Sequence, residues 1–285
     1  MKDLNIETML RMMRPRLNRG DLDPDVIRSH LGDCPWRFRV FAEVNSTNTF
    51  LKKMALEGSP GGTVLVADRQ TGGRGRMGRT FLSPGGVGVY FSALIRPDCA
   101  PTELMHLTCA VAVAMCDAVE NAFGFRPGIK WTNDLVYGGR KLGGILTELG
   151  LDPKTGRVDY AVLGIGINCG QNEWDFDESI RSMATSVRMI TGRKADRNLL
   201  IAEMIKALIS MEQNLLSSSA AILERYRSDC ITLGQEVSIL RGEEVRHATA
   251  LDIDDEGGLV VRYDNGEIAA VTSGEVSVRG LYGYL

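Results

Sequence analysis

The residues best suited to chemistry lie in one loop that is rich in arginine and glycine. The segment 69–79 reads RQTGGRGRMGR, with four arginines and four glycines, and no acidic residue occurs between Asp68 and Asp98. Glycines let a backbone approach a ligand closely and turn its N–H groups inward. Guanidinium groups donate paired hydrogen bonds to phosphate or carboxylate. This composition favours binding of a polyphosphate or an acyl phosphate over a merely solvated basic loop.

The same loop formally matches the dinucleotide-binding pattern GxGxxG at Gly73, Gly75 and Gly78. That pattern works where a helix opens at the last glycine, so that the phosphates meet the helix N-terminus. Here the segment FLSPGG, residues 81–86, follows instead. We therefore interpret the match as accidental, and a Walker A motif is absent as well.

A lysine close to a tight hairpin is the second candidate. Gly138-Gly139 is a two-residue hairpin signal, and Lys141 follows it. Gly143-Gly144 then allows close approach of a ligand or of another strand. Asn133 and Asp134 precede the hairpin at the end of a predicted strand, where they are as readily turn formers as ligand contacts.

Glycines also interrupt an otherwise strong strand, in the segment Gly164-Ile165-Gly166-Ile167-Asn168. Glycine inside a strand indicates a bulge or a close approach of another group to the backbone. Asn168 at the strand end could form hydrogen bonds with a base edge or an amide.

Apolar periodicities predict the elements that position these residues. Predicted strands cover 37–43, 63–67, 87–95, 128–131, 134–137, 142–149 and 158–167, and the last is the continuous apolar run of a central strand. Predicted helices cover 5–14, a segment from Asn45-Ser46 to Gly58, about 20 residues from Pro101, a segment from Asp196 through Met211, and 222–226. The helix after Pro101 is apolar on nearly every side, which predicts that it is buried.

After Leu233 the pattern changes to short strands separated by glycine-containing turns. They are predicted at 236–240, 245–253, 259–263, 268–272 and 276–278, which is typical of a small antiparallel barrel. We therefore expect an α/β fold of the α+β type: a mixed β-sheet with helices packed on it, followed by a small C-terminal antiparallel β-barrel. The predicted divisions are an N-terminal extension at 1–35, a main domain at 36–232 and the barrel at 233–285.

Composition excludes several classes of protein. The 285 residues are 44% hydrophobic and 24% charged, and the net charge of −3 argues against a surface devoted to nucleic acid or acidic membrane. Six scattered cysteines without a CxxC pair indicate reduced thiols. The three histidines show no metal-ligand spacing, so no protein-ligated zinc site is expected. The sequence shows neither the apolar core of a signal peptide nor an apolar stretch of membrane length, so we expect a cytoplasmic protein.

Four motifs together resemble the biotin–protein ligase family over most of residues 36–280. They are GRGRMGR at 73–79, KWTNDLVYGGRKLGGILTEL at 130–149, GIGIN at 164–168 and Ser46-Thr47-Asn48, in the family's order and spacing. The resemblance implies a mixed sheet with helices behind it and a small barrel resembling Src-homology-type domains. It makes the 36–232 region the catalytic domain that binds biotin and ATP.

The resemblance implies a function as well. The family activates biotin with ATP and Mg²⁺ to biotinyl-5′-adenylate and transfers biotin to a lysine of a biotin carboxyl carrier protein of a biotin-dependent carboxylase. Family members that repress transcription carry an N-terminal winged helix, for which the residues before Trp36 are too few. We therefore expect no DNA partner and no membrane partner, and a monomer or homodimer.

The resemblance also assigns roles to residues. Lys141 resembles the family's central lysine near biotin's carboxylate and the α-phosphate, and it shares the catalytic role with Arg74 and Arg76. Expected biotin contacts are Ser46, Thr47, Gln70, Gly73, Arg74, Gly75, Lys141 and Gly143. Expected ATP contacts are Arg76, Arg79, Phe81, Asn133, Asn168 and Arg279. Phe81 stands where the family often has a tryptophan packing near adenine, and the loop at 72–79 is expected to close over biotin and its adenylate.

Three other functions are compatible with parts of the sequence. A lipoate– or octanoyl–protein ligase would share the fold and chemistry, but the arginine–glycine loop and the C-terminal barrel favour biotin. A biotin sensor or DNA-binding regulator is disfavoured by the missing winged helix and by the net charge of −3. A calcium loop beginning at Asp252 fails because Tyr263 stands where its bidentate glutamate is needed.

Overall fold

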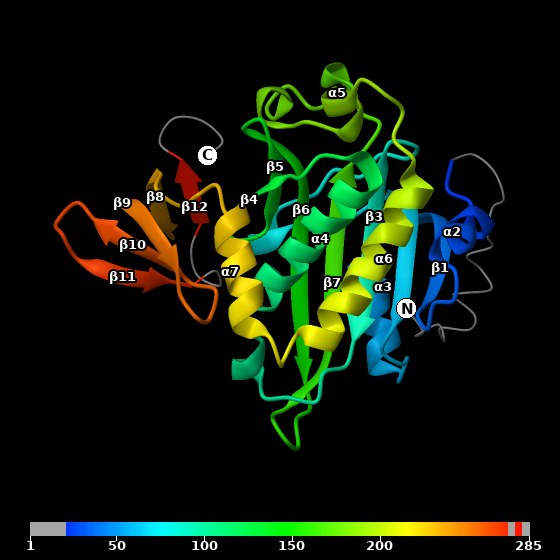
Figure 1. Cartoon of the computed structure of the whole chain (residues 1–285), viewed down its shortest axis with the longest axis horizontal. Helices are drawn as coiled ribbons and strands as arrows, with labels where there is room; N and C mark the ends of the chain where they lie inside the picture. Colours follow the sequence, from blue (N-terminus) through cyan, green and yellow to red (C-terminus); the bar gives the residue numbers. More distant parts are fainter. Residues whose placement is uncertain (1–20, 273–276, 281–285) are drawn as a thin grey trace.

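The larger sheet contains seven strands in the order β1-β2-β3-β7-β6-β5-β4 (Figure 1). The computed structural model describes residues 21–272 and 277–280. β1 runs parallel to β2, and the other neighbouring pairs in this sheet are antiparallel. The predicted mixed sheet is therefore confirmed, with β7 as its middle strand. The predicted helix at 5–14 lies outside the described residues.

The elements of the larger sheet lie close to the predicted ranges. The strands are β1 Arg37–Val44, β2 Thr63–Gln70, β3 Gly88–Ile95, β4 Gly128–Lys130, β5 Asp134–Tyr137, β6 Arg140–Leu151 and β7 Val158–Asn168. The helices are α2 Pro24–Leu31, α3 Thr47–Leu56, α4 Leu107–Phe123, α5 Val187–Thr191, α6 Arg197–Asn214 and α7 Ser219–Asp229. Four short 3-10 turns are η1 Arg76–Gly78, η2 Pro101–Leu104, η3 Glu173–Asp175 and η4 Arg181–Met183.

Alternating side chains give this sheet two different faces. On β2, Val64 and Val66 belong to the core cluster that contains α4 and α6, whereas Leu65 and Ala67 belong to the cluster that contains α3. This division follows from the two-residue period of a strand. The helices thus cover both faces, and α3 lies on the face opposite α4 and α6.

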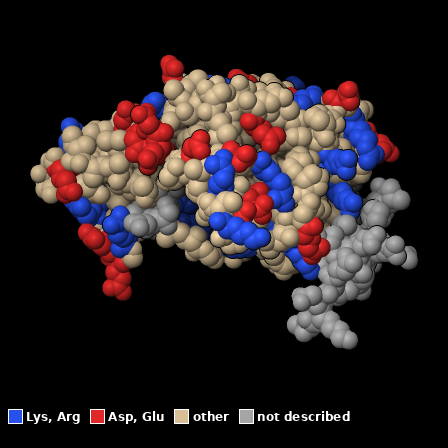
Figure 2. All heavy atoms as spheres, turned by 90° about the horizontal axis from the view of Figure 1, so that it is seen from below, with Lys and Arg blue, Asp and Glu red and all other residues tan. Residues whose placement is uncertain are grey.

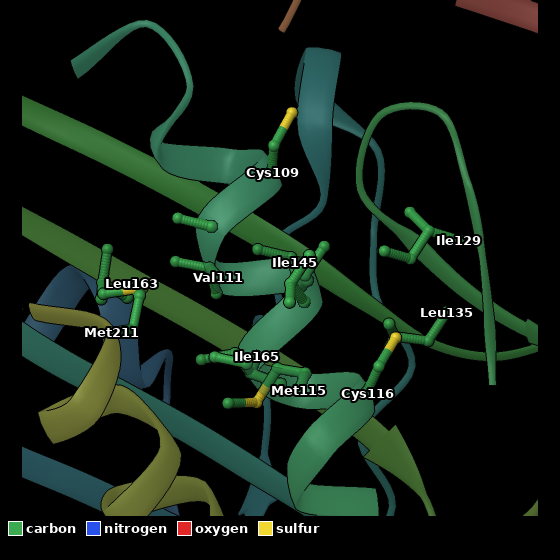
Figure 3. Packing of buried hydrophobic residues seen from close by; sticks show 14 of the residues in the cluster. Cys109, Val111, Met115, Cys116, Ile129, Leu135, Ile145, Leu163, Ile165 and Met211 are labelled. Carbon is green, nitrogen blue, oxygen red and sulfur yellow. The ribbon is translucent and has the colours of Figure 1, made fainter. Parts of the chain in front are cut away.

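Helix α4 fills the centre of the larger core (Figure 3). Its Val111 and Met115 lie among Ile145, Leu163 and Ile165 of β6 and β7. Burial of this helix on nearly every side was predicted and is confirmed. Its start was predicted at Pro101 and lies instead at Leu107, because residues 101–104 form the separate turn η2.

The stretch Pro101–Phe123 corrects the expectation that no apolar segment has the length of a membrane span. It is long and apolar enough by length and composition, with a mean hydropathy of 1.4. However, 72% of the 18-residue window that has this hydropathy is buried inside the protein. The hydropathy therefore reflects a helix at the centre of a core.

The C-terminal region forms a second, antiparallel sheet in the order β11-β10-β9-β8-β12. Its strands are β8 Glu236–Arg241, β9 Glu244–Ile253, β10 Leu259–Tyr263, β11 Ile268–Val271 and β12 Ser277–Gly280. It lies at the β4 end of the larger sheet, beside α7 (Figure 1). The guanidinium of Arg227 on α7 donates to the backbone carbonyl of Ile253 on β9, at 2.6 and 2.9 Å, and so joins the two regions.

Charges of both signs are interspersed over the face of the molecule seen in Figure 2. Lys and Arg side chains lie next to Asp and Glu side chains there, and no wide region of that face carries a single sign. This agrees with the small net charge of −3. Most charged side chains on this face are therefore ordinary solvated surface groups.

Candidate active site

A pocket of about 520 Å³ brings most of the predicted site residues together. Its volume lies within the range usual for small-molecule sites. The pocket is bounded by the start of α3, the end of β2, the arginine–glycine loop, the β5–β6 hairpin and β7. Ten of the predicted residues line it: Ser46, Thr47, Gln70, Arg74, Gly75, Arg76, Arg79, Phe81, Asn133 and Lys141.

The two glycines of β7 leave room for two side chains that line this pocket. Gly164 and Gly166 both line it, and a Cβ at either position would overlap with a pocket side chain, Asn48 for the first and Phe81 for the second. β7 shows no register shift at these residues. Of the two predicted readings of these glycines, close approach is therefore confirmed and a bulge is wrong.

The arginine–glycine loop folds into a small hairpin of its own. The backbone N–H of Gly75 donates to the carbonyl of Arg79 at 2.7 Å, and Arg74 pairs with Thr80. Met77 at the tip has a left-handed conformation with φ 54°, and it is followed by Gly78 at φ 73°. Such a turn needs a residue that tolerates positive φ, which explains the glycines around the tip.

Asn133 links this loop to the sheet. Nη1 of Arg76 donates to Oδ1 of Asn133 at 2.9 Å, and Nδ2 of Asn133 donates to the carbonyl of Ile145 at 2.8 Å. Burial lowers the pKa of the Arg76 guanidinium, and the nearby charge of Arg79 lowers it too, while Asp134 acts the other way. The sequence left the role of Asn133 open, and the structure shows that it positions a pocket arginine.

Lys141 lies on β6 and points at Asp134, where Nζ and Oδ1 are 2.6 Å apart. Both side chains are largely buried, with 31% and 19% of their surface exposed. Lys130, which the sequence interpretation did not single out, also lines the pocket and is buried. Five cations, Arg74, Arg76, Arg79, Lys130 and Lys141, thus face the pocket, with Asp134 as the one acidic residue among its described lining residues. Such a pocket favours a ligand with several negative charges.

Another part of the pocket lining consists of polar, uncharged groups. Oε1 of Gln70 accepts from the backbone N–H of Thr47 at 2.9 Å and from its hydroxyl at 3.1 Å. Nε2 of Gln70 donates to Oγ of Ser83 at 3.0 Å. Ser46, beside Thr47, accepts from the backbone N–H of Thr49 and caps α3. These groups suit a neutral polar ring better than a charged one.

Glu148 is a partly buried carboxylate that the sequence interpretation missed. It accepts from Asn48 at 3.0 Å and from Lys52 at 2.9 Å, and Arg74 lies 3.5 Å away. Burial alone would raise the pKa of this carboxyl, but the hydrogen bonds from Lys52 and Asn48 outweigh it and hold the pKa below its ordinary value. Glu148 lies on the same face of β6 as the pocket residue Gly144. The two-residue period of a strand is the sequence signal that could have predicted this position.

Three of the other predicted residues, Gly73, Gly143 and Asn168, do not line the pocket. Gly73 and Gly143 are packed against their neighbours: a Cβ at Gly73 would lie 2.6 Å from Oγ of Ser83, and one at Gly143 would lie 2.5 Å from the carbonyl of Gly166. Asn168 is buried among other groups, donating to the carbonyl of Thr185 at 3.1 Å and accepting from Gln171 at 3.2 Å. The backbone of Arg279 pairs with Ser238 in the second sheet, and its side chain lies outside the described residues.

Comparison with protein families gives two matches along the chain. Residues 40–168 match the biotin/lipoate A/B protein ligase family, and residues 232–279 match the biotin protein ligase C-terminal domain. The biotin–[acetyl-CoA-carboxylase] ligase of Mycobacterium tuberculosis is 30% identical over 271 residues, covering 93% of this chain and 96% of that protein. The bifunctional ligase/repressor BirA of Bacillus subtilis is 33% identical over 224 residues, covering 78% of this chain and 68% of that protein.

A solved structure agrees with these matches. The biotin protein ligase of Aquifex aeolicus, in complex with biotin and ATP, superposes with a TM-score of 0.72 at 31% sequence identity. The superposition covers 86% of this chain and 99% of the Aquifex protein. The likeness thus includes both the larger sheet that carries the pocket and most of the remaining fold.

Proposed function

The chain belongs to the biotin/lipoate A/B protein ligase family, and we propose that its pocket carries out an ATP-dependent biotin ligation. Biotin is activated with ATP to biotinyl-5′-adenylate, and the biotinyl group is then transferred to a lysine of a biotin carboxyl carrier protein. One observation supports this most directly: a single pocket is lined both by neutral polar groups, among them Thr47 and Gln70, and by five cations. A ligand with a neutral ring at one end and a carboxylate at the other matches that division.

The neutral polar groups of Ser46, Thr47 and Gln70 would bind the ureido ring of biotin. Gly75 and Arg74 of the hairpin loop lie over the same pocket. Closing of this loop would exclude water from the adenylate, whose acyl group hydrolyses readily. Gly73 and Gly143 act behind this surface, because their packing requires glycine.

The cations of the pocket must offset the charge of the reactants. A carboxylate oxygen of biotin attacks the α-phosphorus of ATP, the bond to the β-phosphate breaks, and pyrophosphate leaves. The carboxylate and the triphosphate repel each other, so Lys141, Arg74 and Arg76 would reduce the barrier by neutralising the charge that gathers at the α-phosphate. The lysine amine of the carrier then attacks the acyl carbon, gives up a proton and releases AMP.

The nucleotide would lie between Phe81, Asn133 and Arg79. Phe81 lies close to the bare backbone of Gly166 and lines the pocket, where its ring would pack against the base. Asn168 and Arg279 remain predicted ATP contacts. The buried hydrogen bonds of Asn168 to Thr185 and Gln171 give it a supporting place behind the pocket wall.

Magnesium is the remaining predicted component. Mg²⁺ is usually held by one or two carboxylates together with substrate phosphates, and Asp134 offers one carboxylate inside the cationic pocket. Asp134 would hold the ion, which neutralises phosphate charge when bound. Cytoplasmic location, action as a monomer or homodimer and the absence of a DNA partner also remain predictions.

Transfer of labelled biotin to an isolated biotin-carrier domain, with ATP and Mg²⁺, tests this function. A parallel reaction with labelled octanoate serves as the control, because the matched family includes lipoate ligases. Biotin-specific, ATP-dependent labelling would support the proposal. Tight biotin binding without transfer would indicate a sensor, and a preference for octanoate would assign the chain to the lipoate branch.

A further inference from the structure

We propose that Ser83 is a positioning residue that fixes the amide of Gln70 in one orientation, so that the pocket offers an N–H donor to the ligand. The inference rests on the proposed function, in which Gln70 binds the ureido group of biotin. No role in ligand binding was assigned to Ser83 by the sequence motifs. It lies just after the arginine–glycine loop and is buried, with 6% of its surface exposed.

The first constraint on the Gln70 amide comes from the backbone. The amide of Thr47 can only donate, so the atom 2.9 Å away from its nitrogen must be the oxygen of Gln70. The Thr47 hydroxyl lies 3.1 Å from the same oxygen and donates to it as well. Oε1 of Gln70 is thereby held by two donors from one residue at the start of α3.

The second constraint comes from Ser83 and is independent of the first. Oγ of Ser83 lies 3.0 Å from the carbonyl oxygen of Phe81, which can only accept, so the hydroxyl proton points there. The Ser83 oxygen can then only accept a hydrogen bond from Gln70. The Gln70 atom 3.0 Å away must therefore be the donor Nε2. Both neighbours therefore select the same orientation of the amide.

The close packing of Gly73 keeps this arrangement in place. A Cβ there would lie 2.6 Å from Oγ of Ser83 and 3.1 Å from Nε2 of Gln70. The loop thus passes directly against the Ser83–Gln70 pair, which explains why glycine is needed at a position that does not line the pocket. A side chain at position 73 would therefore displace both members of the Ser83–Gln70 pair.

The consequence is a defined polarity at the pocket wall. The Gln70 oxygen already has two donors, and one of its two N–H groups is used by Ser83, so the other N–H is what Gln70 can offer a ligand. A ureido oxygen accepts such a bond. A cyclic guanidine in which that oxygen is replaced by a protonated nitrogen presents a donor instead, and two donors facing each other are unfavourable.

The test compares two ligands in two steps. Binding of biotin and of its cyclic guanidine analogue, 2-iminobiotin, is measured for the wild-type chain and for Ser83→Ala. In the variant only the two Thr47 donors still hold the amide, so its orientation is less strongly fixed and the preference for biotin over the analogue should fall roughly threefold or more. Ser83→Thr keeps the hydroxyl and should retain the preference. Ser186→Ala is a matched control, because Ser186 is also fully buried and its hydroxyl also donates to a carbonyl, that of Gln171 at 2.6 Å.

A measurement without ligand separates this inference from the proposed function. In the wild-type chain the side-chain N–H of Gln70 that faces Ser83 should exchange with solvent more slowly than its partner, as observed by NMR of the labelled amide. Equal, rapid exchange of both would overturn the inference even if Ser83→Ala fails to fold. Unchanged ligand preference in a folded Ser83→Ala chain would overturn it too. Protected exchange without biotin binding by the wild type would instead contradict the proposed function.

Discussion

The indole N–H of Trp131 donates to the backbone carbonyl of Gly257 at 3.0 Å and so joins the pocket wall to the C-terminal sheet. Trp131 lines the pocket and has 5% of its surface exposed. Gly257 lies in the turn between β9 and β10 with φ 85°, a conformation that favours glycine. The second sheet therefore contacts the site through a buried hydrogen bond rather than through a solvated linker.

Replacing Trp131 with Phe tests the importance of that bond. The substitution keeps an aromatic ring but leaves the carbonyl of Gly257 buried without this donor, which should lower the free energy of unfolding by about 1–3 kcal/mol. Urea unfolding measures the change. Trp174→Phe is the control, because 77% of Trp174 is exposed and its loss should change stability by no more than about 0.5 kcal/mol. Equal effects of the two substitutions would contradict the structural role of the bond.

Lys141 should be required for activation of biotin but not for folding. Lys141→Met removes the charge that would face the carboxylate and the α-phosphate, and the rate of adenylate formation should fall by about 100-fold or more. Release of pyrophosphate in the presence of biotin and ATP measures this step. Arg140→Met removes an exposed charge from the neighbouring position and should leave the rate within about twofold. A Lys141→Met chain with full activity would exclude the proposed role.

The size limit at Gly164 can be tested with alanine. A Cβ there would overlap with the amide of Asn48, so Gly164→Ala should lower stability by about 1–3 kcal/mol and weaken biotin binding. Gly170→Ala is the matched control, since its Cβ would lie 3.5 Å from the nearest atom, an ordinary contact distance. Thermal unfolding and biotin titration measure both effects. Similar behaviour of the two alanine variants would show that the room at Gly164 is not needed.

Much of the fold could be predicted because periodicity and turn residues are local signals. The hairpin at Gly138-Gly139 has both glycines at positive φ, as its turn type requires. Asp196 caps α6 through its side chain, which accepts from the backbone N–H groups of Asn198 and Leu199. The predicted start of the buried helix at Pro101 was wrong because proline is compatible with the first turn of a 3-10 segment as well as of an α-helix.

The site could be predicted less completely because burial and long-range pairing leave weaker signals. Gly73 and Gly143 were predicted as ligand contacts, and the close packing of protein groups against both of them left no signal in the sequence. Lys130 and Glu148 were missed because a single charge in a strand gives no sign of what faces it across the sheet. Only the fold brings Glu148 beside Lys52, 96 residues away in the chain.

The lowered pKa of Glu148 predicts an acid-dependent loss of stability. A carboxyl whose folded pKa lies below its unfolded value stabilises the folded state fully above the unfolded value, and this contribution disappears as the pH falls through the folded pKa. The ordinary value is 4.5. Wild type should therefore exceed Glu148→Gln in unfolding free energy by about 1–3 kcal/mol at neutral pH, and the difference should shrink as the pH falls below 4.5.

Unfolding in urea at several pH values, for both chains, measures this difference directly. Glu178→Gln supplies the control, because Glu178 is exposed on the loop between η3 and η4 and should show a small difference at every pH. If the advantage of wild type over Glu148→Gln is constant from neutral to acidic pH, the hydrogen bonds from Lys52 and Asn48 do not stabilise the ionised form. If the advantage of wild type decreases on acidification as predicted, the charge of Glu148 holds Lys52 and Asn48 in place. Through these two residues it also fixes the start of α3, which carries Thr47.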